Sequence, residues 1–103
     1  MPLKGIKIHE VSYQVTGAGV YGAQSIINAY IVNDTLLPRP YRISVKFFRS
    51  GKEVDTKKSF GVLLPKKGTY VSFETYQTTD YAIVSVYPLL RPLPYDEKEV
   101  TPT

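Results

Sequence analysis

The sequence predicts an all-β domain, a small antiparallel sandwich of six or seven strands. Segments rich in Val, Ile, Tyr and Phe alternate with polar residues, which is the period of a strand with one buried face. Gly, Pro and Asn turns separate these segments, and no segment has the 3.6-residue period of a helix. A chain of 103 residues is long enough for one domain with a single core. A small barrel is the alternative all-β architecture.

The first predicted strand covers residues 6–15. Its apolar phase switches near His9 and Glu10, which indicates either a β-bulge or a passage from one sheet to the other. Residues 16–19 are then expected to form a flexible turn. A second strand over residues 25–32 ends at Asn33, Asp34 and Thr35, where Asn and Asp side chains favour a turn by bonding the backbone two residues on.

The central prediction is a hairpin over residues 41–60, with its turn at Ser50 and Gly51. The first arm alternates apolar and polar residues from Tyr41 to Phe47. An even-length loop would place Phe47 opposite Val54 and Tyr41 opposite Phe60, so that both arms present apolar residues to one face. In this register Lys58 is the one polar misfit on the inner face.

The remaining predicted elements follow in order. Prolines in residues 36–40 favour an extended connector. A strand over residues 69–76 precedes one over residues 81–87, which is apolar on both faces and is expected to be central or at an interface. We therefore expect a sandwich over residues 1–87 and an extended Pro-rich tail over residues 88–103, loose from Asp96 onward.

Short turn motifs resemble the FxLYD and CARDB groups of immunoglobulin-like β-sandwiches. The matching residues are Ile31-Val32-Asn33, Phe47-Phe48, Gly51-Lys52, Leu64-Pro65, Gly68 and Phe73. The similarity spans roughly residues 6 to 87. It implies an immunoglobulin-like fold and a noncatalytic module on secreted or envelope-tethered microbial proteins, in a spacer, adhesion or assembly role.

Composition gives no support to catalysis. The chain has no cysteine and one histidine, so no thiol nucleophile, Cys-based metal site or multi-His zinc site is expected. His9 and Glu10 are adjacent on a strand and point to opposite faces, so they do not form an acid–base pair. We predict no enzyme activity, no cofactor and no metal. The first residues contain no apolar run that suits a signal peptide or a membrane span, so membrane insertion is not expected.

Two surface features suggest binding partners or modification. The basic residues Arg42, Lys46, Lys57, Lys66 and Lys67 could form a basic face, which with nearby tyrosines would suit single-stranded nucleic acid. The alternative is a solvated surface of mixed charge, which we favour. Asn33-Asp34-Thr35 matches the N-glycosylation pattern, although a turn with this sequence by chance is the favoured explanation.

The tail carries the candidate partner-contact residues Leu89, Leu90, Leu93 and Tyr95. Such an arm could dock on a neighbouring subunit or cover this domain's own sheet edge. We therefore expect a structural or protein-interaction module in a homo-oligomeric, cell-surface or virion-type assembly. A nucleic-acid-binding β-domain and a carbohydrate-binding or adhesion module are the alternatives. The abundance of Tyr and Pro, with no Trp or Cys, is typical of thermophile proteins.

Overall fold

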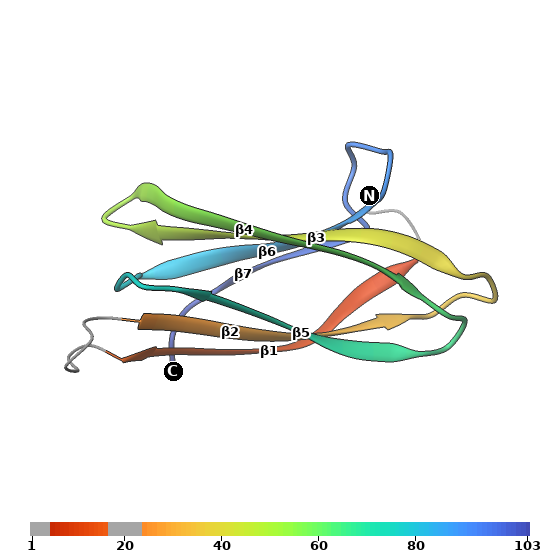
Figure 1. Ribbon diagram of the computed structural model, residues 1–103, viewed down its shortest axis with the longest axis horizontal. Helices are drawn as coiled ribbons and strands as arrows, with labels where there is room; N and C mark the ends of the chain where they lie inside the picture. The colour runs from red at the N-terminus through yellow and green to blue at the C-terminus, as the bar shows by residue number, and fades with distance from the viewer. Residues whose placement is uncertain (1–4, 17–23) are drawn as a thin grey trace.

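The computed structural model describes residues 5–16 and 24–103, so most of the turn expected at residues 16–19 lies outside the described residues. Within them the chain forms seven strands: β1 (Ile6–Thr16), β2 (Gln24–Asn33), β3 (Arg39–Arg49), β4 (Lys52–Leu63), β5 (Gly68–Thr75), β6 (Tyr81–Pro88) and β7 (Asp96–Val100). They make two antiparallel sheets, β1-β2-β5 and β4-β3-β6-β7, which pack face to face (Figure 1). The predicted antiparallel β-sandwich is confirmed.

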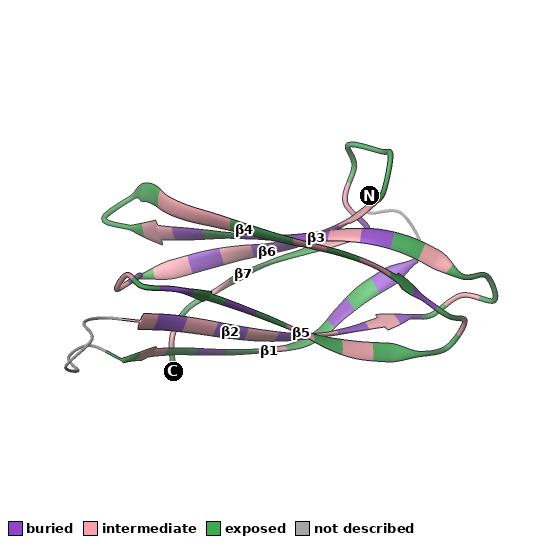
Figure 2. Ribbon diagram, viewed as in Figure 1, coloured by how far each residue is buried: buried purple, intermediate pink, exposed green. Residues whose placement is uncertain are grey.

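The core lies between the two sheets and is built from alternate residues of their strands (Figure 2). The four-stranded sheet contributes Tyr41, Ile43, Val45, Phe47, Ala82, Val84 and Val86, and the three-stranded sheet contributes Ile6, Ile8, Tyr13, Ile27, Ala29, Ile31 and Phe73. As predicted, β6 is central, because it lies between β3 and β7. The described residues contain no helix of the length and apolarity that crossing a membrane would require.

The phase switch in the first strand is a β-bulge. Ile8 pairs with Ile31 and Glu10 pairs with Tyr30, so His9 is the extra residue of β1. The bulge lets both Ile8 and Tyr13 reach the core although they are an odd number of residues apart. Of the two explanations that the sequence left open, the β-bulge is the correct one.

The β3–β4 hairpin has the predicted turn but not the predicted register. Ser50 and Gly51 form a two-residue turn with φ angles of 52° and 79°, the left-handed values of a type I′ turn. Phe48 pairs with Glu53 as expected, but Phe47 pairs with Asp55, because Val54 is an extra, bulged residue of β4. Every later pair is shifted by one residue. Phe60 lies opposite Arg42 instead of Tyr41.

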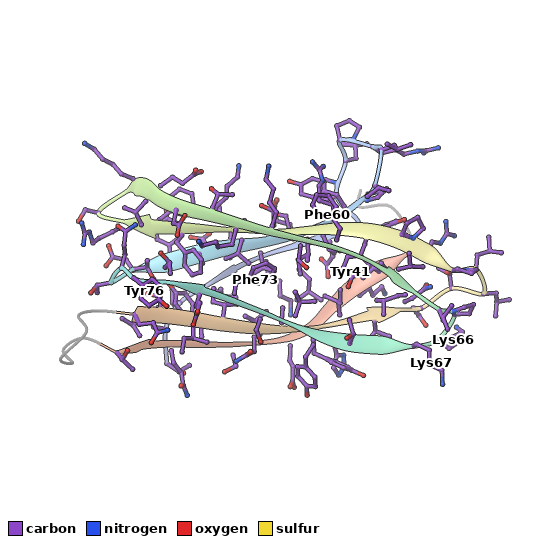
Figure 3. The ribbon with its side chains drawn as sticks, in the orientation of Figure 1. Tyr41, Phe60, Lys66, Lys67, Phe73 and Tyr76 are labelled. Carbon is purple, nitrogen blue, oxygen red and sulfur yellow. The ribbon has the colours of Figure 1, made fainter. Side chains whose placement is uncertain are left out.

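This shift reverses the faces predicted for β4. Phe60 and Val62 lie on the outer side of the sheet and are 63% and 61% exposed. Figure 3 shows Phe60 outside β4, whereas Tyr41 and Phe73 lie between the sheets. Lys58 pairs with Ser44 on the outer face, so it is not a misfit in the core. Tyr41 instead covers Gly61, where a Cβ would clash with the tyrosine ring.

The chain beyond residue 87 is more ordered than expected. Asp96–Val100 forms β7, which pairs with β6 and completes the four-stranded sheet, so the prediction of a loose chain from Asp96 is wrong. Asp96 also accepts a hydrogen bond from the Ile8 amide at 2.9 Å, which ties β7 to β1 across the sandwich. The covering of a sheet edge, one of the two roles considered for the tail, is the role of β7.

Candidate functional site

The outer face of the four-stranded sheet is organised as rows of side chains, because β4, β3, β6 and β7 lie side by side in register. In each strand the residues that alternate with the core point outward here. In the order β4, β3, β6, β7, three successive rows are Phe60, Arg42 and Tyr87; Lys58, Ser44, Ser85 and Glu97; and Thr56, Lys46, Ile83 and Glu99. Cations therefore lie on the β4–β3 half of the face, and carboxylates lie on β7.

Arg42 is held over a shallow groove in this face. Its guanidinium carbon lies 4.5 Å from the centroid of the Tyr87 ring, a cation–π contact. The groove has a volume of about 290 Å³ and is lined by Arg42, Ser44, Lys46, Lys58, Tyr87 and Pro92. Within residues 5–16 and 24–103, Arg42, Lys46 and Lys58 have no ion-pair partner, and the buried Nε of Arg42 has no acceptor. The groove therefore carries uncompensated positive charge.

A loop of residues 89–94 stands beside this groove and projects away from both sheets (Figure 1). Leu90 and Leu93 are 93% and 60% exposed, and Leu89 is also exposed. We call residues 89–94, which carry these three side chains, the leucine loop. Pro92 of the same loop lines the groove, so the loop overhangs the outer face. Of the predicted partner-contact residues, the three leucines are accessible for binding.

Tyr95, the fourth predicted contact residue, is buried in this chain. Its amide donates to the Val86 carbonyl at 2.7 Å. Its ring covers Gly5, where a Cβ would clash with it. Tyr95 therefore fixes the base of the leucine loop rather than presenting itself to a partner.

The predicted basic residues are distributed over separate parts of the molecule. Arg42 and Lys46 share the groove, and Lys58, which was not among the residues expected to form the basic face, joins them. Lys57 points to the other side of β4, with its Nζ 3.7 Å from Asp55. Lys66 and Lys67 lie in the β4–β5 turn at one end of the sandwich (Figure 3), and Lys66 pairs with Asp34 at 3.3 Å. These residues do not form a continuous surface that could follow a nucleic-acid backbone.

Asn33 is unsuited to carry a glycan. Its side chain is fully buried, and its Nδ2 donates to the carbonyls of Leu37 at 2.8 Å and Leu63 at 2.9 Å. Its Oδ1 accepts the Thr35 amide at 3.0 Å, which is the predicted turn bond two residues on. The atom that glycosylation would modify is therefore enclosed in the fold, and the prediction of a possible glycan on Asn33 is corrected.

The bulge puts His9 and Glu10 on the same, outer side of the three-stranded sheet, so the prediction that they point to opposite faces is wrong. Among the described residues no hydrogen bond joins the two side chains. The bulge places His9 edge-on to Tyr30, with ring centroids 6.0 Å apart, and both His9 and Glu10 are exposed to solvent. The ring centroids of Tyr30 and of Tyr70 on β5 lie 4.6 Å apart. His9, Tyr30 and Tyr70 thus form an aromatic row across the outer side of the three-stranded sheet. No group of three or more metal-binding side chains occurs in the described residues.

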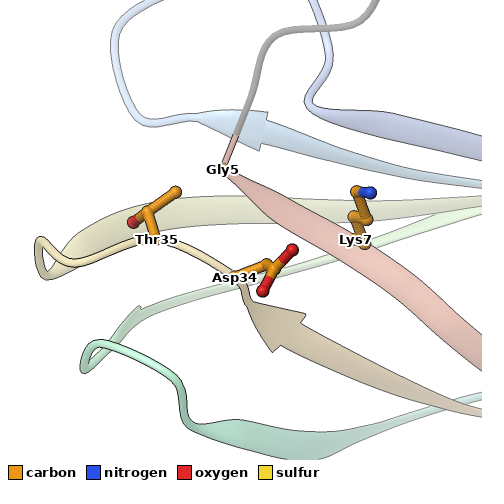
Figure 4. Close-up of a pocket in the computed structure, with 4 residues that line it drawn as sticks. All are labelled: Gly5, Lys7, Asp34 and Thr35. Atoms are coloured by element: carbon orange, nitrogen blue, oxygen red, sulfur yellow. The ribbon is translucent and has the colours of Figure 1, made fainter.

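A second pocket lies at the end of the sandwich, with a volume of about 250 Å³ (Figure 4). It is lined by Gly5, Lys7, Asp34 and Thr35. The Asp34 carboxylate is paired with Lys66, and the Asp34 amide donates to the Gly5 carbonyl at 3.1 Å. The pocket thus offers one carboxylate that already has a partner, which is not a constellation for general acid–base chemistry.

Known proteins resemble this chain in fold only. No family model matches it, and no curated protein matches it. A calcium-binding mutant of Bacteroides uniformis β-glucuronidase 2 aligns with a TM-score of 0.70 and 14% identity over 94% of this chain. The same enzyme covalently bound to cyclophellitol-6-carboxylate aziridine aligns with a TM-score of 0.67 and 14% identity over 92%. The chain spans only 12% of each of these proteins.

Proposed function

We propose that this chain is a noncatalytic β-sandwich module that binds proteins through the leucine loop and the outer face beside it. The observation that carries the proposal is the exposure of Leu90 and Leu93 on a loop whose base is fixed by Tyr95. Removing exposed leucine side chains from water lowers the free energy, and contiguous apolar surface on a folded domain marks interaction sites. Phe60 and Val62 add exposed apolar surface on the same face.

The fixed base of the loop supports this function energetically. Binding costs free energy when a flexible segment must become ordered, so a preorganised loop binds more tightly than a loose one. The strands that precede and follow the loop, β6 and β7, pair with each other, and the pair nearest to the loop is Val86 with Asp96. The match to a small part of a much longer enzyme is consistent with a module that works beside other domains.

A photo-crosslinking residue, p-benzoylphenylalanine, in place of Leu90 tests the proposal in cells that produce the chain. The expected result is a single protein adduct of defined mass. The same residue in place of Lys67, which is also exposed but lies in the β4–β5 turn that connects the two sheets, serves as the control and should give no such adduct. Equal labelling at both positions, or no protein adduct at position 90, would refute the proposed function.

A carbohydrate-related module is the second candidate, favoured by the aromatic row of His9, Tyr30 and Tyr70. Tyr30 and Tyr70, packed at an interplanar angle of 45°, lie beside the hydrogen-bonded pair Asn28 and Ser72, and together they offer apolar and polar contacts, as small-ligand sites do. The structural likeness to part of a β-glucuronidase agrees with this candidate. Affinity electrophoresis in polysaccharide gels tests it: Tyr70→Ala should abolish any retardation of the protein, and Phe60→Ala on the opposite face should not.

A further inference from the structure

The outer face of the four-stranded sheet is complementary to itself. One row runs Lys58, Ser44, Ser85, Glu97 across the four strands, with a cation at one edge, a carboxylate at the other and two serines between them. We propose that a second copy of this chain binds face to face about a twofold axis that runs parallel to the strands between β3 and β6. The proposal specifies the partner of the proposed function and rests on it.

The symmetry decides which residues meet. A twofold rotation about such an axis exchanges the two edges of the sheet but keeps each level along the strands. Lys58 therefore faces Glu97 of the second copy, and Glu97 faces Lys58 of the second copy. Ser44 and Ser85 meet in the same way at the centre. An isologous contact of this kind forms every pair twice, so two ion pairs arise from one row.

The apolar surfaces meet under the same rotation. The leucine loop begins after Pro88, which lies level with Tyr41, and Tyr41 lies level with Gly61 on β4. The loop is thus near the level of Phe60 and Val62, but it leaves the face between β6 and β7, whereas Phe60 and Val62 lie on β4. The rotation places the leucine loop of each copy over Phe60 and Val62 of the other. The exposed apolar residues of the face then cover one another.

The two serines at the centre of the row and the Glu97 carboxylate already have the arrangement that this contact needs. Ser44 and Ser85 are small and lie low between their neighbours, at 7% and 4% exposure, so two sheets can approach closely there. The Ser85 hydroxyl donates to Glu97 Oε2 at 2.6 Å, which holds the carboxylate in position before binding. Less side-chain freedom is then lost when Glu97 meets a cation.

The size of the face is sufficient for a dimer. Four strands about 4.8 Å apart and about eight residues long measure roughly 19 by 26 Å in projection. The leucine loop adds to this area, and the accessible surface of side chains exceeds its projection. A stable interface buries about 800 Å² on each partner, which is within reach of such a face.

The charge pattern favours a second copy over other occupants. A nucleic acid would be attracted to Arg42, Lys46 and Lys58, but the carboxylates of Glu97 and Glu99 line the same face and repel phosphates. An unrelated acidic protein would match the basic half alone. A second copy places Lys58 opposite Glu97 twice, whereas Lys46 meets Ile83 and Glu99 meets Thr56. The row of Lys58 and Glu97 thus supplies the charge complementarity that specific interfaces show.

Sedimentation equilibrium of four variants tests the proposal: Lys58→Glu, Glu97→Lys, the two combined, and the control Lys67→Glu. The wild-type chain and the control should dimerise with equal affinity. Each single reversal places like charges together and should raise the dissociation constant roughly tenfold or more. The double reversal restores opposite charges across the axis and should recover most of the affinity. Melting curves of every variant confirm that the fold is kept.

The outcomes separate this inference from the proposed function. If both single reversals leave the dimer intact while Leu90→Asp with Leu93→Asp dissociates it, the leucine loop binds in another geometry and the face-to-face arrangement is wrong. A wild-type chain that remains monomeric up to millimolar concentration overturns the second copy as the partner. Photo-crosslinking at position 90 then decides the proposed function independently.

Discussion

At the scale of single residues, Asn33 joins the two sheets. It ends β2 of the three-stranded sheet, and its amide group donates to the carbonyl of Leu63 on β4 of the four-stranded sheet. The same side chain accepts the Thr35 amide and hydroxyl and so closes the turn that follows β2. Buried polar groups stabilise a fold only while all their partners are present.

We predict that Asn33→Ala lowers the free energy of unfolding by about 2–5 kcal/mol, because it leaves buried carbonyls without a donor. The matched control is Asp34→Ala, which removes an exposed ion pair with Lys66 and should cost no more than about 1 kcal/mol. Urea unfolding of both variants measures the two effects. Similar losses in the two variants would show that Asn33 does not connect the sheets energetically.

Asp55 makes the stability of the fold depend on pH in the acid range. The Thr75 hydroxyl lowers the pKa of this carboxyl, and the Thr56 amide and the Lys57 ammonium act in the same direction against partial burial. A carboxyl whose pKa is lower in the folded state stabilises the fold above the pKa of the unfolded chain, and this contribution is lost as pH falls through the folded pKa.

Asp55→Asn should therefore have a larger effect at neutral pH than in acid. Melting temperatures of the wild type and the variant should differ most near pH 7 and converge as the pH falls through the lowered pKa of the folded carboxyl, which lies below the ordinary value of 3.8. Glu53→Gln on the exposed turn is the control and should shift little at either pH. A constant difference across the pH range would contradict the role assigned to Asp55.

At the scale of elements, the strands were predictable from the sequence because alternation and turn residues are local signals. The bulge in β1 was also predictable, since the apolar phase switches inside one strand. The bulge at Val54 was not, because Val54 is apolar and fits the inner face of either register. Its consequence is large: it puts Phe60, Val62 and Lys58 on the outer face, where the candidate site lies.

β7 was also not predictable from the sequence. Its sequence, Asp-Glu-Lys-Glu-Val, has almost no apolar residues, so no burial signal identifies it. It is an edge strand that is held in the sheet by backbone pairing to β6. Its charged side chains protect the sheet edge from pairing with other strands. The resemblance to FxLYD and CARDB domains and the thermophile origin stay predictions.

We predict that deleting residues 96–103 lowers the melting temperature by roughly 10 °C or more, because β6 loses one of its two neighbouring strands and β1 loses the bond from Ile8 to Asp96. Lys98→Ala, which alters an exposed side chain of β7 but keeps the strand, should shift it by only a few degrees. The measurement is a thermal melt of both variants. An unchanged melting temperature after the deletion would mean that β7 does not stabilise the sandwich.

At the scale of the whole molecule, the two sheets have different outer faces. The three-stranded sheet carries the aromatic row of His9, Tyr30 and Tyr70, in which each ring already packs against a neighbour. The four-stranded sheet carries carboxylates, exposed apolar residues and cations that have no ion-pair partner within the part of the chain that the structure describes. A face-to-face pair of copies would pair Lys58 of each copy with Glu97 of the other and would cover the leucine loop.

The absence of cysteine from the sequence permits a direct measurement of this arrangement. Leu90→Cys and Val62→Cys are made as separate single variants, mixed, and oxidised mildly. Because the twofold axis brings residue 90 of one copy to residue 62 of the other, the mixture should form a disulfide-linked dimer, whereas each variant alone should form little. A mixture of Leu90→Cys with Tyr70→Cys, on the opposite sheet, is the control. If the Leu90–Val62 mixture cross-links no faster than this control, the face-to-face account is wrong.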